Sequence, residues 1–211
     1  MSGAARRTGS ASRAGAGALD VAFYDRPVLE VAPDLIGCVV RHGDTAGVIV
    51  ETEAYHRSEP ASHAWAGLTA RTEPLFGPPG IAYVYRSYGI HALLNAVCDH
   101  VDSGAAVLIR ALEPYDGIEV MRARRRVARD VDLCNGPGKL TQALGIGLEL
   151  NRTSLLDGPI RIEPRAPGWE APALDVGRRI GITKAVDLDW RFCARGNRHV
   201  SRPWPSRAHA A

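Results

Sequence analysis

The feature that most constrains the fold is a run of β-forming residues in which two carboxylates and a tyrosine occupy every second position. This run, residues 48–55, reads VIVETEAY. Because side chains alternate across a strand, Glu51, Glu53 and Tyr55 share one face. Such a face is either a solvated acidic edge or one wall of a polar site. The polar loop that follows the run can fold His63 back over the end of the strand, which would favour the second interpretation.

A second stretch, residues 80–91, concentrates aromatic side chains at a turn. It reads GIAYVYRSYGIH and holds three of the six tyrosines of the chain. Tyr83 and Tyr85 share one face of a strand, whereas Tyr88 precedes Gly89, where a tight turn can push a ring into solvent. An aromatic ring on such a turn is suited to wedge two stacked groups apart.

The remaining pattern predicts one α+β domain, a curved antiparallel sheet flanked by helices. We expect a short helix capped by Asp25 that breaks near Pro33. The predicted strands span residues 38–41, 46–55, 81–86, 90–97, 105–112, 159–163 and 178–182, and further helices are expected within 116–130 and 140–144. The domain is predicted to cover residues 20–200, between a disordered tail at 1–19 and a loose tail at 201–211.

Composition places the protein in a broad class. A hydrophobic content of 45% supports one core, and a net charge of +3 is compatible with nucleic acid. The four cysteines are scattered singly and are typical of buried groups in a reducing compartment. Residues 1–19 contain no secretory signal, although a transit peptide is an alternative to a disordered tail. We therefore expect an intracellular, cytoplasmic monomer with no membrane contact, associated with the nucleoid if it is bacterial.

Three basic residues are candidates for charged contacts. Arg110 interrupts an almost wholly apolar strand and therefore needs an anion, for which a carboxylate of residues 48–55 is the obvious partner. That pair can be purely structural. Arg71, in the long loop 56–79, and Lys139, in a Gly-Pro-Gly turn that enters a helix, can each contact a DNA phosphate. For Arg71 an ordinary exposed side chain is the alternative, and the turn before Lys139 lacks the residues of a nucleotide-triphosphate loop.

Six motifs in one order carry a resemblance to a known family. They are ETEAY at 51–55, His63, YVYxxYG at 83–89, Asn95, VLIRALEP at 107–114 and CNGPGKL at 134–140. Together they resemble the alkyladenine (3-methyladenine) DNA glycosylase family, from about Tyr24 to about Phe192. The resemblance implies a monofunctional base-excision repair enzyme that flips alkylated purines out of double-stranded DNA and hydrolyses the N-glycosidic bond, leaving an abasic site.

The resemblance also implies roles for the polar residues. Glu53 matches the general base of the family, and Arg110 would hold it ionised and orient the attacking water. Asn95 lies where the family places a residue that excludes the 2-amino group of guanine. Glu51 is expected to be structural.

The aromatic residues are expected to hold the DNA. Tyr88 would fill the gap that the flipped nucleotide leaves, as the family resemblance also implies. Tyr55, His63 and Tyr85 would then enclose the extruded base, with aromatic faces that favour cationic alkylated purines. Tyr83 is expected to be a core residue.

Two other classes of function remain open at this point. A non-catalytic nucleic-acid-binding module, with a fold like the C-terminal domain of methionyl-tRNA formyltransferase, would use the same sheet and basic surface. A metal-dependent hydrolase would need a ligand set that His63 does not complete, so neither a metal nor another cofactor is expected. A lyase activity would need an amine, and the chain offers only Lys139, Lys184 and its N-terminus.

Overall fold

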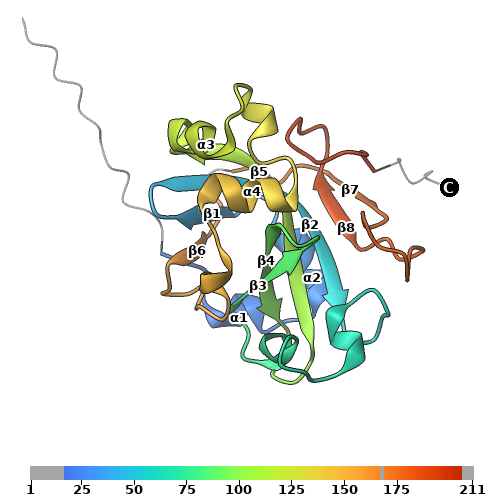
Figure 1. Ribbon diagram of the computed structural model, residues 1–211. Coiled ribbons are helices and arrows are strands. Elements are labelled where there is room, and N and C mark those ends of the chain that lie inside the picture. The colour runs from blue at the N-terminus through green and yellow to red at the C-terminus, as the bar shows by residue number, and fades with distance from the viewer. Residues whose placement is uncertain (1–16, 167–168, 206–211) are drawn as a thin grey trace, which may run out of the picture.

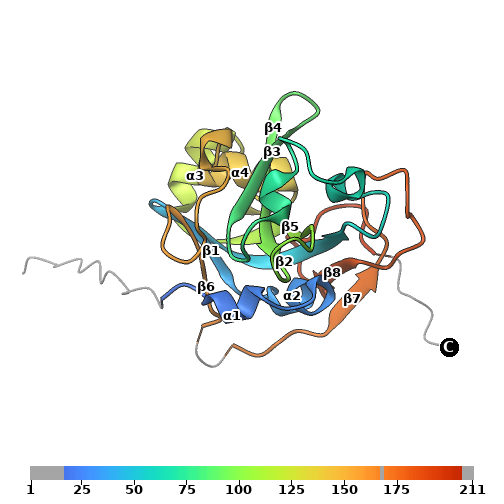
Figure 2. The same cartoon turned by 90° about the horizontal axis from the view of Figure 1, so that it is seen from below.

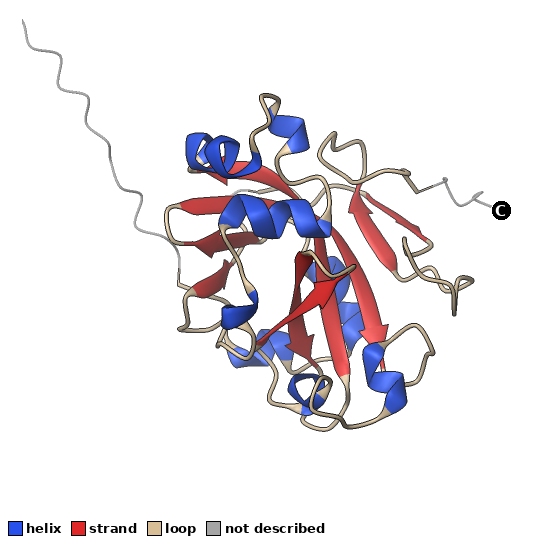
Figure 3. Ribbon diagram, in the orientation of Figure 1, coloured by secondary structure: helices blue, strands red, loops and turns tan. Residues whose placement is uncertain are grey.

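The computed structural model describes residues 17–166 and 169–205, and within them the chain forms one curled antiparallel sheet with short helices around it (Figures 1 and 3). The strands lie in the order β3-β4-β5-β2-β1-β6, with β8 paired to β2 and β7 paired to β8. The predicted α+β fold is confirmed. The strands are β1 (Val39–His42), β2 (Thr45–His56), β3 (Ala82–Ser87), β4 (His91–Cys98), β5 (Ala105–Asp116), β6 (Ile160–Glu163), β7 (Leu174–Gly177) and β8 (Arg191–Ala194).

Strand β2, which contains the VIVETEAY run, is the centre of the sheet. It pairs with β5 along one edge, and with β1 and then β8 along the other. Glu53 lies opposite Leu108 of β5 on one side and opposite Arg191 of β8 on the other. The β2–β5 register shifts on both sides of Glu51, and irregularities of this kind bend and twist a sheet. Both glutamates are therefore enclosed by neighbouring strands.

Helices cover the two faces of the sheet at different places (Figure 2). Thr52 of β2 donates a hydrogen bond from Oγ1 to Ala32 O of α2 at 2.8 Å, on the face opposite to Glu53. Thr141 of α4 donates to Ala92 O of β4 at 2.7 Å. The α-helices are α1 (Val21–Tyr24), α2 (Val28–Asp34), α3 (Ile118–Arg125) and α4 (Pro137–Leu144), and the 3₁₀ helices are η1 (His63–Ala66), η2 (Glu73–Phe76), η3 (Asp130–Asp132) and η4 (Leu148–Leu150).

The N-terminal helix differs in detail from the prediction. Asp20, not Asp25, is the N-cap of α1, where its side chain accepts a hydrogen bond from Phe23 N at 3.0 Å. Asp25 follows the last residue of that helix. A second helix, α2, ends at Asp34, one residue after Pro33 and near the predicted break. Proline has no N–H to donate to the carbonyl four residues earlier, which weakens the last turn of the helix.

The C-terminal third departs most from the prediction. Residues 178–182 form no strand, because Gly181 takes a left-handed φ of 75° and the segment turns toward the middle of the sheet. The strands of this border are β7 and β8, which the sequence pattern did not indicate. The helix expected within 116–130 is shortened to α3, which ends where Arg126 adopts a left-handed conformation. All four cysteines are buried, as predicted.

The two predicted tails fall largely outside the described residues, as 1–16 and 206–211 do. Where the N-terminal tail is described, Leu19 N donates to Ile162 O of β6 at 2.8 Å. Ser201, where the loose C-terminal tail was predicted to begin, is buried and bonds to Glu51, so the ordered part of the chain continues past residue 200. In the described ranges, no helix is long and apolar enough to cross a membrane.

Candidate active site

The alternating face of β2 is buried, not solvated. Glu51 and Glu53 are both 0% exposed, so the solvated acidic edge considered above is wrong. Tyr55 donates from its hydroxyl to Glu53 Oε2 at 2.8 Å, which confirms that these side chains share one face. Burial, followed by the charge of Glu53, raises the pKa of Tyr55 well above its ordinary value, so the phenol keeps its proton and remains a donor.

Glu53 is held by three donors, one from its own strand and two from distant parts of the chain. Oε2 accepts from Tyr55 and from Arg110 Nη1, the latter at 3.1 Å, and Oε1 accepts from Ile180 N at 2.7 Å. Hydrogen bonds to a charged carboxylate are stronger than neutral ones, and a buried charge needs them. The three donors therefore satisfy the hydrogen-bonding requirement of a carboxylate in the middle of the sheet.

Arg110 of β5 bonds to both glutamates. Its Nε donates to Glu51 Oε1 at 3.0 Å while its Nη1 reaches Glu53. Burial lowers the pKa of the guanidinium, but Glu53 and Glu51 together raise it above its ordinary value. The predicted pairing of Arg110 with a carboxylate of β2 is confirmed, and the arginine is shared between two of them.

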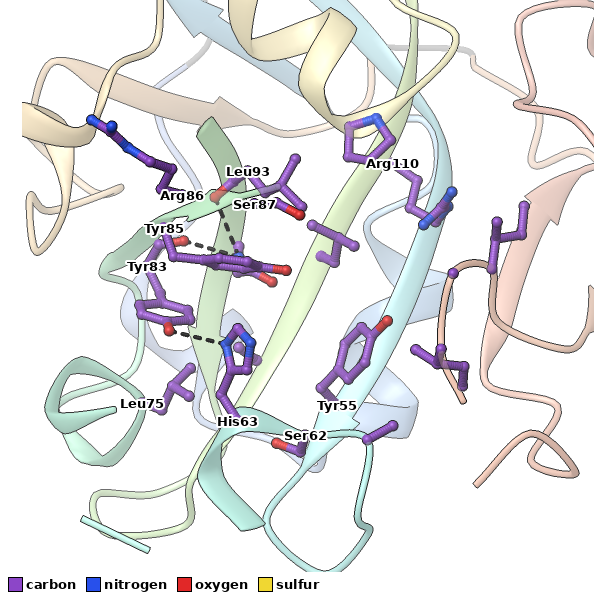
Figure 4. A pocket seen from close by; sticks show the side chains of 18 of the residues that line it. Tyr55, Ser62, His63, Leu75, Tyr83, Tyr85, Arg86, Ser87, Leu93 and Arg110 are labelled. Carbon is purple, nitrogen blue, oxygen red and sulfur yellow. Dashed lines mark hydrogen bonds between the residues drawn. The ribbon is translucent and has the colours of Figure 1, made fainter. Parts of the chain in front are cut away.

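A cavity of about 770 Å³ opens beside this cluster (Figure 4). This volume lies within the range of pockets that hold small molecules. Tyr55 faces His63, Tyr83 and Tyr85 across the cavity. The three donors to Glu53 all line the cavity, and Glu53 lies directly behind them. Of the predicted residues, those in the cavity wall are Tyr55, His63, Arg71, Tyr85, Tyr88, Asn95 and Arg110.

His63 lies in this cavity as a neutral imidazole. Its Nδ1 is 3.1 Å from Tyr83 Oη, and its Nε2 is 3.2 Å from a terminal nitrogen of Arg71. Because arginine can only donate, Nε2 must be the acceptor and Nδ1 carries the proton. Burial, and then the Arg71 charge, lower the pKa of His63 to about 4. The ring also meets Tyr85 edge to face, with centroids 4.6 Å apart.

The wall opposite Tyr55 is supported by residues of the core. Tyr83 is buried as predicted, and its ring stacks on Tyr85 with centroids 5.3 Å apart. Asn95 of β4 is buried, and its Nδ2 donates to Tyr83 O at 3.0 Å. Because the amide nitrogen is committed to the backbone, the side-chain oxygen of Asn95 is the atom that remains for a ligand.

Tyr88 occupies the tip of the β3–β4 hairpin. It is 86% exposed and has a φ of 48°, and the following Gly89 has a φ of 75°. A bulky residue with positive φ is unusual, and such strain is concentrated at functional sites. The hairpin therefore presents a ring to solvent at the mouth of the cavity.

The two candidates for phosphate contact lie in different places. Arg71 lies at the cavity rim, with its guanidinium carbon 5.6 Å from the centroid of the Tyr85 ring. Lys139 does not line the cavity, and its Nζ donates to Asn135 Oδ1 at 2.8 Å. The fold thus brings Arg71, but not Lys139, to the predicted base-binding residues.

The sequence analysis missed the segment that closes one side of the site. Residues 180–184 line the cavity, and Ile180 N bonds to Glu53. Arg179 anchors this segment, because its side chain is fully buried and bonds to both oxygens of Glu59 at 2.7 and 2.9 Å. The Arg179 guanidinium also lies 4.6 Å from the centroid of the Tyr55 ring. The hydrogen bond from Ile180 N leaves no signal in the sequence, because every residue except proline has a main-chain N–H.

Arg191 and Ser201 were also missed, and both bond to Glu51. For Arg191 a signal was present. It stands between Trp190 and Phe192 in an apolar strand, as Arg110 does in β5, and the reasoning that required an anion for Arg110 applies equally to it. Among the described residues, no group of three or more His, Cys, Asp or Glu side chains could hold a metal ion.

Comparison with known proteins gives consistent results. The family model described as methylpurine-DNA glycosylase matches residues 22–198. A protein of Rhodopseudomonas palustris (strain BisB18), named "Putative 3-methyladenine DNA glycosylase", is 51% identical over 86% of this chain and 90% of its own length. Proteins with the same name from Bradyrhizobium diazoefficiens and Methanoculleus marisnigri are 52% and 49% identical, over 87% of this chain and 90% and 98% of their own lengths. The chain therefore belongs to the methylpurine-DNA glycosylase family.

Proposed function

We propose that this protein is a DNA-3-methyladenine glycosylase that flips a modified purine from duplex DNA into the cavity and releases the base by hydrolysis. The family supports this activity. The observation that carries the mechanism is the position of Glu53, a buried carboxylate whose three hydrogen-bond donors all line an aromatic cavity. A base inside a duplex cannot be reached by such a group, so the nucleotide must leave the stack.

The aromatic residues support recognition of the flipped base. Tyr55 and the pair His63 and Tyr85 lie on opposite sides of the cavity and would enclose a planar ring between them. Base–aromatic stacking contributes about 1–3 kcal/mol per base, which offsets much of the cost of unstacking. Asn95 supplies a polar atom in the wall, and a purine that leaves this atom unpaired, or that clashes with it, is rejected.

Glu53 is assigned as the general base. Cleavage of the glycosidic bond builds positive charge on the sugar, which an ionised carboxylate stabilises while it accepts a proton from water. Such assistance is typically worth about 10²–10⁴ in rate. Glu53 is fully buried in the free protein. The mechanism therefore requires that one water enter beside Tyr55 or Ile180 when the base binds.

Arg110 and Tyr88 are assigned to two further steps. Arg110 keeps Glu53 ionised and orients the water, since it lies in the cavity wall and bonds to the carboxylate. Tyr88 inserts into the duplex in place of the flipped nucleotide. Its exposure and its position at the mouth of the cavity support this assignment.

Phosphate contacts are assigned to Arg71 and, further from the cavity, to Lys139. We also propose that the protein acts as a monomer. A DNA substrate supports a location with the chromosome, in the cytoplasm and at the nucleoid if the source is bacterial.

A base-release assay tests the proposal against the binding-only and metal-dependent alternatives. Duplexes that each carry one modified purine, 3-methyladenine, hypoxanthine or ethenoadenine, are incubated with the protein in the presence and absence of a chelator. Free 3-methyladenine in both samples is the expected product. Binding without release would support the non-catalytic module, and release that disappears with chelator would support metal-dependent hydrolysis.

A further inference from the structure

Glu51, which the proposed reaction does not use, is bonded as tightly as Glu53. Its Oε1 accepts from Arg110 Nε at 3.0 Å, from Arg191 Nε at 2.7 Å and from Ser201 Oγ at 2.8 Å. Its Oε2 accepts from Ser201 N at 2.7 Å. Four donors and complete burial hold the Glu51 carboxylate in a fixed position.

Arg191 and the C-terminal segment form the other half of this arrangement. Arg191 lies in β8 opposite Glu53 and is almost fully buried. It donates from Nη1 to Pro203 O at 2.9 Å and from Nη2 to Ser201 O at 3.0 Å. The family match ends at residue 198, so Ser201 and Pro203 lie beyond it. A segment outside the matched region thus reaches the centre of the sheet.

The charges of the cluster balance. Two carboxylates, Glu51 and Glu53, meet two guanidinium groups, Arg110 and Arg191, and each of the four side chains is buried. Because Arg191 neutralises the charge of Glu51, the positive charge of Arg110 remains available to Glu53. Removal of one member would leave a buried charge without its partner, which is strongly destabilising.

The geometry of Arg110 shows what Glu51 contributes. An arginine beside a single carboxylate commonly binds it with two parallel N–H groups. Here Nε is directed to Glu51, and only Nη1 reaches Glu53. If Glu51 did not hold Nε, the guanidinium could rotate and occupy both oxygens of Glu53. Oε1 of Glu53 would then lose its capacity to accept from anything besides Ile180 and Arg110.

We propose that Glu51, Arg191 and Ser201 form a positioning network that fixes the orientation of Arg110. In this orientation Arg110 donates one N–H to Glu53 and leaves the carboxylate able to accept a hydrogen bond from water. This inference rests on the proposed function of Glu53 and Arg110. The three residues act through Arg110 and do not touch the substrate.

Two substitutions of different severity test the network. Ser201→Ala removes only the hydroxyl bond to Glu51, and Glu51→Gln keeps the shape of the side chain while removing its charge. Both should leave the Kd for a 3-methyladenine duplex nearly unchanged. The single-turnover rate of base release should fall by about 10- to 100-fold in Glu51→Gln, the scale expected for a misplaced catalytic group, and by less in Ser201→Ala.

The variant Arg110→Lys provides a second background, in which an effect on the positioning of Arg110 can be separated from an effect on stability. In Arg110→Lys, the ammonium cannot bridge two carboxylates through a rigid fork, so the network has nothing left to orient. Adding Ser201→Ala to Arg110→Lys should cause no further loss in rate. A rate loss that multiplies across the two sites would overturn the route through Arg110.

The matched control is Glu163→Gln. Glu163 is another buried glutamate, bonded to Arg41 Nε at 2.7 Å in the β1–β6 region, and it does not line the cavity. Its substitution should lower the melting temperature but not the rate per folded molecule. If Ser201→Ala and Glu51→Gln behave like this control, the network is structural only and the inference is wrong. If the unaltered protein releases no base at all, the proposed function itself fails.

Discussion

Substitution of Tyr88 by asparagine should change stability and DNA binding in opposite directions. Tyr88 and Gly89 both have positive φ, and Ile90 N donates to Ser87 O at 3.2 Å, as in a two-residue turn of the kind that favours Asn-Gly. For a residue with a Cβ, the left-handed conformation costs about 1–2 kcal/mol, and asparagine tolerates it best. The wild-type hairpin therefore carries strain at its tip.

The burial that is lost with the ring is small. Tyr88 is 86% exposed. Of the roughly 200 Å² of a tyrosine side chain, only about 30 Å² is covered, which is worth about 0.7 kcal/mol at most. The balance favours the variant by up to about 1 kcal/mol. For a chain of this size the melting temperature should rise by about 1–3 °C.

The same change removes the ring that is proposed to fill the duplex. Loss of one stacked aromatic costs about 1–3 kcal/mol. The Kd for a duplex that contains 3-methyladenine should therefore increase by about 5- to 150-fold. Release from a single-stranded substrate, in which no gap has to be filled, should change little.

Thermal melting and fluorescence anisotropy with a labelled lesion duplex measure the two effects on one preparation. Tyr88→Phe is the matched control, because it keeps both the ring and the strain and should resemble the unaltered protein in both assays. A variant Tyr88→Asn that binds the duplex normally would refute the wedge. A melting temperature several degrees lower would show that the ring packs against the protein and that the strain argument is wrong.

Three further predictions concern charge and chemistry. Burial lowers the pKa of His63 to about 4, below its unfolded value near 6.5, so between these values the unfolded chain binds more protons and stability is lost as the pH falls. The melting temperature of His63→Asn should therefore differ less between pH 7 and pH 4.5 than that of the unaltered protein, and an unchanged difference would contradict this. Lys139 lies outside the cavity wall, whereas Lys184 is part of it, so the choice between water and an amine as the nucleophile has to be tested directly. If water activated by Glu53 attacks the sugar, lesion DNA should remain unbroken before alkali and no protein–DNA adduct should form with borohydride; a trapped adduct would indicate an amine nucleophile, with Lys184 as the first candidate. Arg71→Ala should weaken lesion binding more than Lys139→Ala, measured as Kd at fixed salt, because only Arg71 lies at the cavity rim; equal losses would argue against a special position.

Whether the sequence could predict a feature of this site depends on how far apart in the chain the interacting residues lie. The alternation of Glu51, Glu53 and Tyr55 follows from the period of a strand, and the anion requirement of Arg110 follows from burial, so both could be predicted locally. The exposed ring of Tyr88 follows from the adjacent glycine. These features are set by a few neighbouring residues.

The contacts that could not be predicted join segments far apart in the chain. Ile180 donates a main-chain N–H to Glu53 across 127 positions, and any residue except proline offers that group. Ser201 reaches Glu51 across 150 positions, from a segment whose composition suggested a loose tail. Residues 178–182 were predicted as a strand at the border of the sheet, but the ion pair of Arg179 with Glu59 and the left-handed Gly181 direct the segment to the cavity instead.

The central claim is that the Glu53 carboxylate performs the chemical step, and Glu53→Gln tests it most directly. The amide keeps the shape of the side chain but places an NH₂ group against at least one of the three donors, so a melting curve must first show that the variant is folded. Single-turnover release and the Kd for the same 3-methyladenine duplex are then measured beside the unaltered protein. The account predicts a Kd within a few-fold and release slower by about 10²–10⁴-fold or more. Release by the folded variant at a rate near that of the unaltered protein would contradict it and show that another group activates the water.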